Sequence, residues 1–384
     1  MGNKPRIRFK GFTEDWEQRK LSDVADVRDG THDSPKFYND GFPLVTSKNL
    51  KGGSIDFSDC SFISEQDFNE INKRSKVDPG DILFGMIGTI GNPAIVEHTG
   101  FAIKNVALIK EGNIINNRFI YHLLSSKVFE NYIARENAGG TQKFIALNQI
   151  RNFDFLAPAL VEQNKIIELL DCISQNITLH QCKLEKLKLT KKALLQKLFP
   201  KNGKHIPEIR FKGFTDAWEQ RKLKSIANTI VAGGDIDKTK IKEIGTYPVI
   251  ANALTKEGIV GYYNDDYRIE APAVTVTGRG DIGVAKARHQ NFTPVVRLLS
   301  LTTAHDVDFI EHAINNLKIV SESTGVPQLT VPQLSNYKIH ITSIIEEQKI
   351  GVFISKLDNL ITLHQRKLER LQEVKKGLLQ KMFV

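Results

Sequence analysis

Two long stretches of the chain carry apolar residues at the three- and four-residue spacing of a helix buried along one side. Residues 162–199 contain no Gly or Pro, and residues 346–384 repeat their pattern. The apolar positions are Ile166, Leu170, Ile173, Ile177, Leu184, Leu187, Leu194 and Leu198, then Ile350, Ile354, Leu357, Ile361, Leu368, Leu371, Leu378 and Met382. A heptad seam of this length predicts a coiled coil of two long helices.

Polar residues interrupt this seam at matching positions in the two stretches. They are His180 with His364 and Lys191 with Lys375. A polar group on a coiled-coil seam commonly sets register and orientation. If the helices pack antiparallel, the two histidines can face each other. We favour this role over metal ligation, because no carboxylate or cysteine lies at ligand spacing on the seam.

The segments before each long helix have a different pattern. Residues 21–160 and 223–345 hold short β-like runs broken by Gly, Pro, Asn and Asp, with helical runs at 116–137 and 308–323. This spacing predicts mixed α/β modules built on a curved sheet. The overall fold class is therefore α+β.

Two copied segments show that the chain is an internal duplication. Residues 7–25 and 209–227 match at 14 of 19 positions, and residues 177–199 and 361–383 match at 16 of 23. The modules between them differ greatly, which indicates a shared scaffold holding two modules that do different versions of one job. We predict a first module at 1–160, a central helix at 161–203, a second module at 204–345 and a C-terminal helix at 346–384.

Composition narrows the class of protein. The 384 residues include 53 Lys and Arg against 44 Asp and Glu, a net charge of +9. Such an excess suits a nucleic-acid partner, although many proteins without one share it. Three scattered cysteines fit a reducing cytoplasm and exclude a disulfide framework or a CxxC zinc site. No apolar run is long enough to span a membrane, and no signal peptide is expected.

Motifs for catalysis are missing from the sequence. Gly278, Gly280 and Gly283 form a G-x-G-x-x-G pattern, but the residues that follow resemble another strand, so we predict a strand–turn–strand loop rather than a dinucleotide site. Gly85, Gly88 and Gly91 form a related pattern in the first module. There is no phosphate loop, G-x-S-x-G, HExxH or Asn/Asp-Pro-Pro-aromatic motif. We predict a binding protein with no catalytic residues and no metal site.

Several motifs resemble the specificity subunit of bacterial type I restriction–modification systems. They are the FKGFT-x-x-WEQRKL segment at 10–21 and again at 212–223, RDGTHDSPKFYNDGFPLVTSKNLKGGSI at 28–55, and GDILFGMIGTIG with its counterpart TVTGRGDIG. Further matches are GGTQKFIALNQIRNFDFLAPALVEQ and TGVPQLTVPQLSNYKIHITSIIEEQ, each of which leads into a long helix. The resemblance covers nearly the whole chain in duplicated order.

The resemblance implies two pseudo-twofold-related target-recognition domains, separated by an antiparallel coiled coil. Each domain would read one half of a bipartite site in double-stranded DNA, and the helices would set the gap and dock two methyltransferase subunits. This subunit would hold no cofactor. Its partners would use S-adenosylmethionine for adenine-N6 methylation, and two restriction subunits would add ATP- and Mg²⁺-dependent cleavage in the bacterial cytoplasm.

The family's recognition domains vary too much for contact residues to be transferred, so candidates rest on chemistry. Arg, Lys, Asn, Gln, Ser, Thr and His read base edges and phosphates. The candidates are Thr31, His32, Lys36, Thr46, Ser47, Lys48, Asn49, Arg74 and Lys143, then Lys238, Lys240, Asn252, Thr277, Arg279, His289 and Gln328. Arg279 is the strongest, because it stands between two glycines that allow close approach to DNA.

Two other classes of protein stay open. One is a non-enzymatic protein-binding scaffold whose basic charge is incidental. The other is a stand-alone methyltransferase or nuclease, which the missing motifs disfavour.

Overall fold

The fold is described from a computed structural model, which describes residues 4–112, 114–136, 144–201, 203–320 and 327–384. Packing divides the chain into two units: Met1–Gln181 with Arg366–Val384, and Cys182–Gln365. Each unit therefore combines one sheet module with one end of each long helix. The sequence had instead predicted the helices as segments separate from the modules. Lys143 lies outside the described residues.

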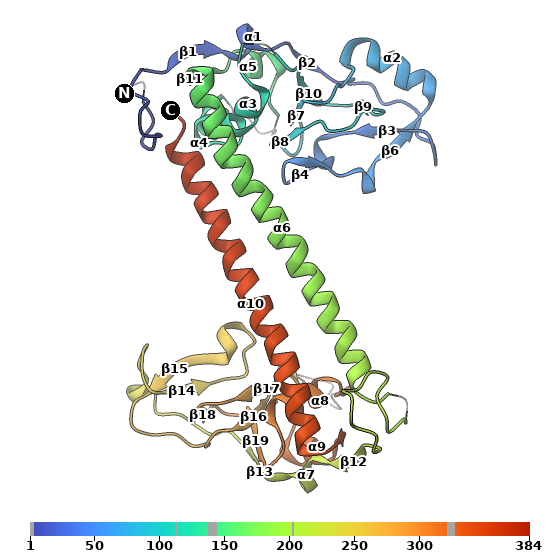
Figure 1. The fold of residues 1–384 in the computed structure, drawn as a ribbon, viewed down its shortest axis with the longest axis vertical. Helices are drawn as coiled ribbons and strands as arrows, with labels where there is room; N and C mark the ends of the chain where they lie inside the picture. The colour runs from blue at the N-terminus through green and yellow to red at the C-terminus, as the bar shows by residue number, and fades with distance from the viewer. Residues whose placement is uncertain (1–3, 113, 137–143, 202, 321–326) are drawn as a thin grey trace. The chain divides into compact units, whose positions relative to one another are not determined.

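The first module is built around an antiparallel four-stranded sheet in the order β2-β10-β7-β8 (Figure 1). A smaller sheet, β6-β3-β9, and two strand pairs, β1-β11 and β4-β5, complete it. The elements are β1 (Glu17–Lys20), α1 (Leu21–Val24), β2 (Val27–Asp29), β3 (Phe42–Val45), η1 (Ser47–Asn49), β4 (Leu50–Lys51), β5 (Ser54–Ile55), η2 (Phe57–Asp59), β6 (Ser61–Ile63), α2 (Glu65–Ser75), β7 (Ile82–Gly85), β8 (Gly91–Ile95), β9 (Ala102–Ile103), β10 (Val106–Ile109), α3 (Asn117–Leu124), α4 (Lys127–Glu136), α5 (Leu147–Arg151) and β11 (Asp154–Ala157).

The second module repeats this topology. Its four-stranded sheet has the order β13-β19-β16-β17, beside the sheet β15-β14-β18 and the pair β12-β20. The elements are β12 (Glu219–Lys222), α7 (Leu223–Ile226), β13 (Ala227–Ala232), η3 (Lys238–Lys240), β14 (Tyr247–Ile250), η4 (Thr255–Gly258), β15 (Ile259–Tyr263), β16 (Ala273–Val276), β17 (Ala285–Arg288), β18 (Thr293–Pro294), β19 (Leu299–Thr303), α8 (Val307–Asn315), α9 (Val331–Asn336) and β20 (Lys338–Ile341).

Each unit has its own apolar core around one of the two tryptophans. Trp16 packs with Phe119 in the first unit, and Trp218 packs with Phe309 in the second. Both indole rings are almost fully buried. The two copies of the segment that carries these tryptophans therefore have the same structural task, which explains why their sequences remain so similar.

The long helices are α6 (Leu160–Leu198) and α10 (Ile344–Lys381). In the first unit Leu170 of α6 shares a core with Met382, just after α10, and in the second Leu198 shares a core with Ile350. The start of one helix thus packs beside the end of the other in each unit, so the paired segments are antiparallel. The predicted seam positions are buried or half-buried, which confirms the seam.

One helix prediction was too long. The run predicted at 308–323 ends as a helix at Asn315. The side chain of Asn315 accepts a hydrogen bond from the backbone N–H of Ala285 (2.8 Å) and donates one to its carbonyl oxygen (3.0 Å). The asparagine therefore binds the edge strand β17, and the backbone leaves the helix after it.

Candidate nucleic-acid interface

In each module several of the polar candidates lie at one end of the four-stranded sheet. In the first module β2 and β7 end there, and β8 and β10 begin there. In the second module β13 and β16 end at the corresponding edge, and β17 and β19 begin there. The glycine patterns form the β7–β8 and β16–β17 turns, as predicted. Gly88 and Gly280 have φ angles of 75° and 76°, a left-handed conformation that glycine adopts without strain.

A hydrogen-bonded chain links three loops of the first module. Arg74 pairs with Asp29, which is 6% exposed. The other oxygen of Asp29 lies 2.9 Å from Nε2 of His32, and Nδ1 of His32 lies 2.8 Å from Oδ1 of Asn105. The hydrogen bonds to Asn105 and then Asp29 raise the pKa of His32, because they favour the imidazolium form. The chain of hydrogen bonds therefore holds the exposed His32 ring in place at the end of the sheet.

Asn105 and Arg297 occupy the same strained position in the two modules. Each lies just before an inner strand, β10 or β19, and each has a left-handed backbone, with φ angles of 54° and 70°. This conformation is unusual for residues other than glycine, and especially so for a long side chain such as arginine. Strain of this kind gathers at functional sites when the surrounding structure enforces it.

Two candidate residues hold these strained turns. The hydroxyl of Ser47 donates to the carbonyl oxygen of Asn105 (3.2 Å), and the amide of Asn252 donates to that of Val296 (3.1 Å). Asn252 also accepts from the backbone N–H of Gly278 (2.8 Å). Ser47 and Asn252 therefore position neighbouring loops.

The remaining candidates of the second module lie on the β16–β17 turn and beside it. Arg279 pairs with Gln328 through a backbone bridge, and the guanidinium of Arg297 donates to the side-chain oxygen of Gln328 at 3.5 Å. The hydroxyl of Thr277 donates to the carbonyl oxygen of Asp281 within the turn. Arg279, Gln328 and Arg297 are exposed, whereas Thr277 is buried and shapes the turn.

Some candidates of the first module have local structural roles. Thr31 accepts a hydrogen bond at its hydroxyl from the backbone N–H of Asp33 (3.1 Å), beside His32. Thr46 and Asn49 cap η1, where Oδ1 of Asn49 accepts from both the N–H and the hydroxyl of Thr46, each at 2.9 Å. Asn49 is only 1% exposed, so its side chain shapes the loop.

The other candidates are exposed lysines and one histidine. Lys48 pairs with Asp59 at 3.2 Å, and Lys36 lies over the Tyr38 ring. Lys238 and Lys240 form η3. His289 follows β17 at the opposite end of the β16–β17 hairpin from Arg279, and its Nε2 lies 3.0 Å from Asp308.

Sequence reasoning missed several residues at the sheet ends: Ile87, Lys104, Asn105, Phe144, Arg268 and Arg297. The segments FAIKNVALIK and FTPVVRLLSL hold Asn105 and Arg297, but Arg297 lies one residue further from the shared Phe, so a direct alignment would pair Asn105 with Val296 instead. The positive φ angle of these residues has no signal in the sequence. Ile87 and Phe144 carry no polar signal in the sequence, because exposed apolar side chains there resemble core residues.

The two histidines of the seam are buried and the two lysines are half-buried. His180 and His364 are 8% and 9% exposed; whether they face each other stays a prediction. Lys191 pairs with Asp358 at 2.5 and 2.7 Å. Burial lowers the pKa of Lys375. Lys191 thus forms an ion pair, and the role of the seam residues in setting register stays a prediction.

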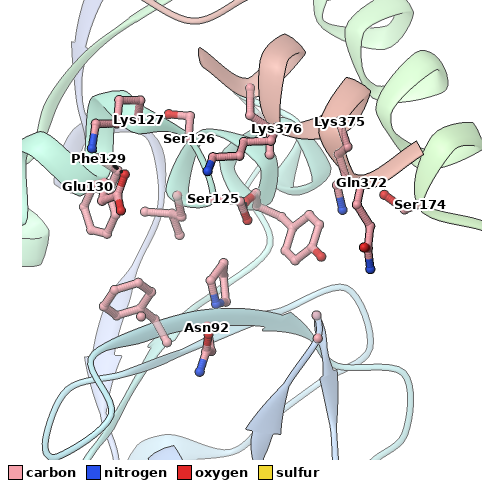
Figure 2. Close-up of a pocket in the computed structure, with 18 of the residues that line it drawn as sticks. Asn92, Ser125, Ser126, Lys127, Phe129, Glu130, Ser174, Gln372, Lys375 and Lys376 are labelled. Carbon is pink, nitrogen blue, oxygen red and sulfur yellow. Dashed lines mark hydrogen bonds and ion pairs between the residues drawn. The ribbon is translucent and has the colours of Figure 1, made fainter. Parts of the chain in front are cut away.

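The first unit holds a cavity of about 750 Å³ between the module and the helix segments (Figure 2). Lys127 and Glu130 of α4 line one side and pair at 2.9 Å. Lys376 enters from α10, and the strand β8, which carries Asn92, lies across the cavity from them. Within the described residues, no group of three or more His, Cys, Asp or Glu could hold a metal ion, and no helix has the length and apolar character needed to cross a bilayer.

Comparison with known proteins agrees with this geometry. Residues 13–189 and 215–373 match the family described as the type I restriction modification DNA specificity domain. The chain belongs to this family. Both matched regions combine one sheet module with part of a long helix, so the duplication seen in the sequence is a duplication of the family's domain.

Individual relatives support the assignment. The chain is 30% identical over 206 residues to a putative type I specificity subunit of Mycoplasma pneumoniae, a match that covers 52% of this chain and 54% of that protein. It is 23% identical to the putative MjaX specificity subunit of Methanocaldococcus jannaschii, over 95% and 92% of the two chains. The crystal structure of a type I restriction–modification S subunit from M. genitalium has the same fold, with a TM-score of 0.71 at 15% identity and 99% coverage of both chains.

Proposed function

We propose that this chain is the DNA sequence-specificity subunit of a type I restriction–modification complex, in which each module reads one half of a bipartite double-stranded DNA site. The observation that carries the proposal is the duplicated loop cluster, where strained, charged and polar residues gather at the same sheet end in both modules. A protein that reads two half-sites needs one such surface in each module, with different residues.

The size and charge of these surfaces support DNA as the ligand. Four strands about 4.8 Å apart are about 14 Å wide, close to the major groove of B-DNA, which is about 12 Å wide. The second module brings Arg268, Arg279 and Arg297 to this end, and the first brings Arg74, His32 and Lys104. Arginine and lysine neutralise phosphates and arginine also reads guanine.

The proposal includes partners that carry the chemistry. Two methyltransferase subunits would use S-adenosylmethionine, and two restriction subunits would use ATP and Mg²⁺; this subunit would bind none of these. A structure titled as concerning complex assembly and conformational transition of the type I R-M system shares the fold, with a TM-score of 0.51 at 16% identity. Leu179, Leu189 and Leu363, which lie off the seam, are 60–67% exposed, as expected for helix faces that dock a partner and set the gap.

The test is to express the chain with its methyltransferase subunit and to sequence the methylated adenines of the host. We expect one bipartite motif with a fixed gap. Replacing residues 21–160 by the module of another family member should change one half-site and leave the other intact. A continuous motif, or no methylation, contradicts the proposal.

A protein-binding scaffold with incidental charge would behave differently in salt. Affinity for DNA should fall steeply between about 50 and 200 mM salt when several phosphates are contacted. Salt-insensitive binding, or none, favours the scaffold.

A further inference from the structure

The two modules carry side chains of different polarity at equivalent positions of the loops at the sheet end. In the first module Ile87 on the β7–β8 turn forms a backbone bridge with Phe144, and in the second Arg279 on the β16–β17 turn forms the same bridge with Gln328. One module therefore shows an apolar pair where the other shows a polar pair.

The equivalence of these positions rests on the backbone around them. The N–H of Ile145 donates to the carbonyl oxygen of Met86 (2.9 Å), and that of Leu329 donates to Gly278 (2.9 Å). Each bridge is followed at once by a left-handed glycine, Gly88 or Gly280. The two turns therefore pair with corresponding segments of their modules, and each has a left-handed glycine at the same position.

All four side chains are exposed. Ile87 is 44% exposed and Phe144 is 49% exposed, an unusual pair of large apolar groups on loops that otherwise carry polar residues. The turn of Arg279 lies against that of Arg297, because a Cβ added at Gly278 would lie 2.1 Å from the carbonyl oxygen of Arg297. The pairs thus belong to the surface defined by the strained residues.

These two chemistries select different bases in a major groove. Arginine donates two hydrogen bonds to O6 and N7 of guanine, and glutamine pairs with adenine or supports a neighbouring contact. Apolar side chains contact the C5-methyl group of thymine. An apolar pair gains nothing from guanine or cytosine edges and leaves their polar atoms unpaired.

We infer that Ile87 and Phe144 select a thymine by its methyl group in the half-site of the first module, whereas Arg279 with Gln328 selects a guanine in the half-site of the second. The inference rests on the proposed function. It makes the two half-sites chemically distinct at equivalent positions of two otherwise similar readers.

Base analogues test each contact on the complex of this chain with its methyltransferase subunit. The bipartite motif is first found from methylated adenines, and then each thymine of the first half-site is replaced in turn by deoxyuridine, which lacks only the methyl group. We expect about a fourfold loss of affinity at one position, since one buried methyl group contributes about 0.8 kcal/mol. In the second half-site, 7-deazaguanine removes the N7 acceptor, and we expect about a fivefold or greater loss at one guanine.

Variants identify the residues. Ile87→Ala with Phe144→Ala should abolish the deoxyuridine effect, and Arg279→Ala should abolish the 7-deazaguanine effect and relax that guanine in the methylated motif by about 5- to 150-fold. The matched controls are Arg19→Ala and Arg221→Ala, in the copied segments outside the candidate surfaces, which should leave both analogue effects unchanged. Thermal unfolding checks that the variants remain folded.

The outcomes separate this inference from the proposed function. A complex that methylates no bipartite motif overturns the proposed function. A bipartite motif whose thymines tolerate deoxyuridine, or whose guanines are unaffected by Arg279→Ala, overturns the inference alone. The inference is also overturned if the variants of one module abolish both the deoxyuridine effect and the 7-deazaguanine effect, because each pair of residues should act on its own half-site.

Discussion

Replacing Glu346 by glutamine should destabilise the second unit by about 3–5 kcal/mol. The carboxylate of Glu346 accepts two hydrogen bonds from Arg210, at 2.7 and 2.8 Å, and the two side chains are 0% and 11% exposed. Among the described residues, Nη1 of Arg210 has no acceptor, so the guanidinium depends on Glu346. Glutamine would remove the counter-charge and turn an N–H donor toward the guanidinium, leaving a buried charge uncompensated.

Urea unfolding followed by tryptophan fluorescence measures this loss. In a Trp16→Phe background, Trp218 is the only indole and reports on the core of the second unit. The control is Glu219→Gln, which breaks an exposed ion pair with Arg221 and should cost no more than about 1 kcal/mol. The reasoning is wrong if Glu346→Gln costs no more than this control. Removing both charges, with Arg210→Met and Glu346→Leu, should restore much of the stability.

Three further predictions concern charge and loop position. Burial, and then Lys191, lowers the pKa of His312 to about 4, so stability should fall by up to about 3 kcal/mol as the pH drops from about 6.5 through 4; unfolding of His312→Leu should lack this part of the acid sensitivity. The raised pKa of His32 predicts that DNA affinity weakens as the pH rises above about 6.5, where the imidazolium loses its proton; fluorescence anisotropy of His32→Ala should show a flatter profile, and an unchanged one contradicts the role. Asn252→Ala should weaken binding to the specific site but leave the slope of affinity against salt unchanged, because the neutral Asn252 amide holds the backbone of Val296 and Gly278 and adds no charge that neutralises a phosphate.

Large parts of the fold could be predicted from the sequence because they depend on periodic burial. The heptad seam of α6 and α10 and the copied tryptophan segments each place apolar side chains in a core, and such patterns are readable one residue at a time. The glycine patterns also gave the correct strand–turn–strand loops, since a dinucleotide site would need a helix where β17 begins.

The loop cluster was predicted only in part because its members meet through long-range pairing. Ser47 and Asn252 were chosen as base readers by residue type, yet both hold neighbouring backbone carbonyls. Asn49 was chosen for the same reason and caps a helical turn. Which polar side chain faces outward depends on hydrogen-bond partners far away in the chain, and residue type carries no information about them.

The duplication preserves the contacts that join each module to a long helix, whereas the exposed side chains at the sheet ends differ. The buried pairs Arg8–Glu162 and Arg210–Glu346 have the same geometry, 2.7 and 2.8 Å in each. Each pair joins a copied segment before its module to the first turn of a long helix.

The sheet ends, in contrast, share backbone conformation but not side chains: both have a left-handed residue and a bridged glycine turn, yet they carry Asn105 and Ile87 in one module and Arg297 and Arg279 in the other. Because hydrogen bonds hold the strained turns, the exposed side chains on them can be substituted at little cost in stability. Under the proposed function, this arrangement lets the recognised half-site change in one module while the scaffold stays the same.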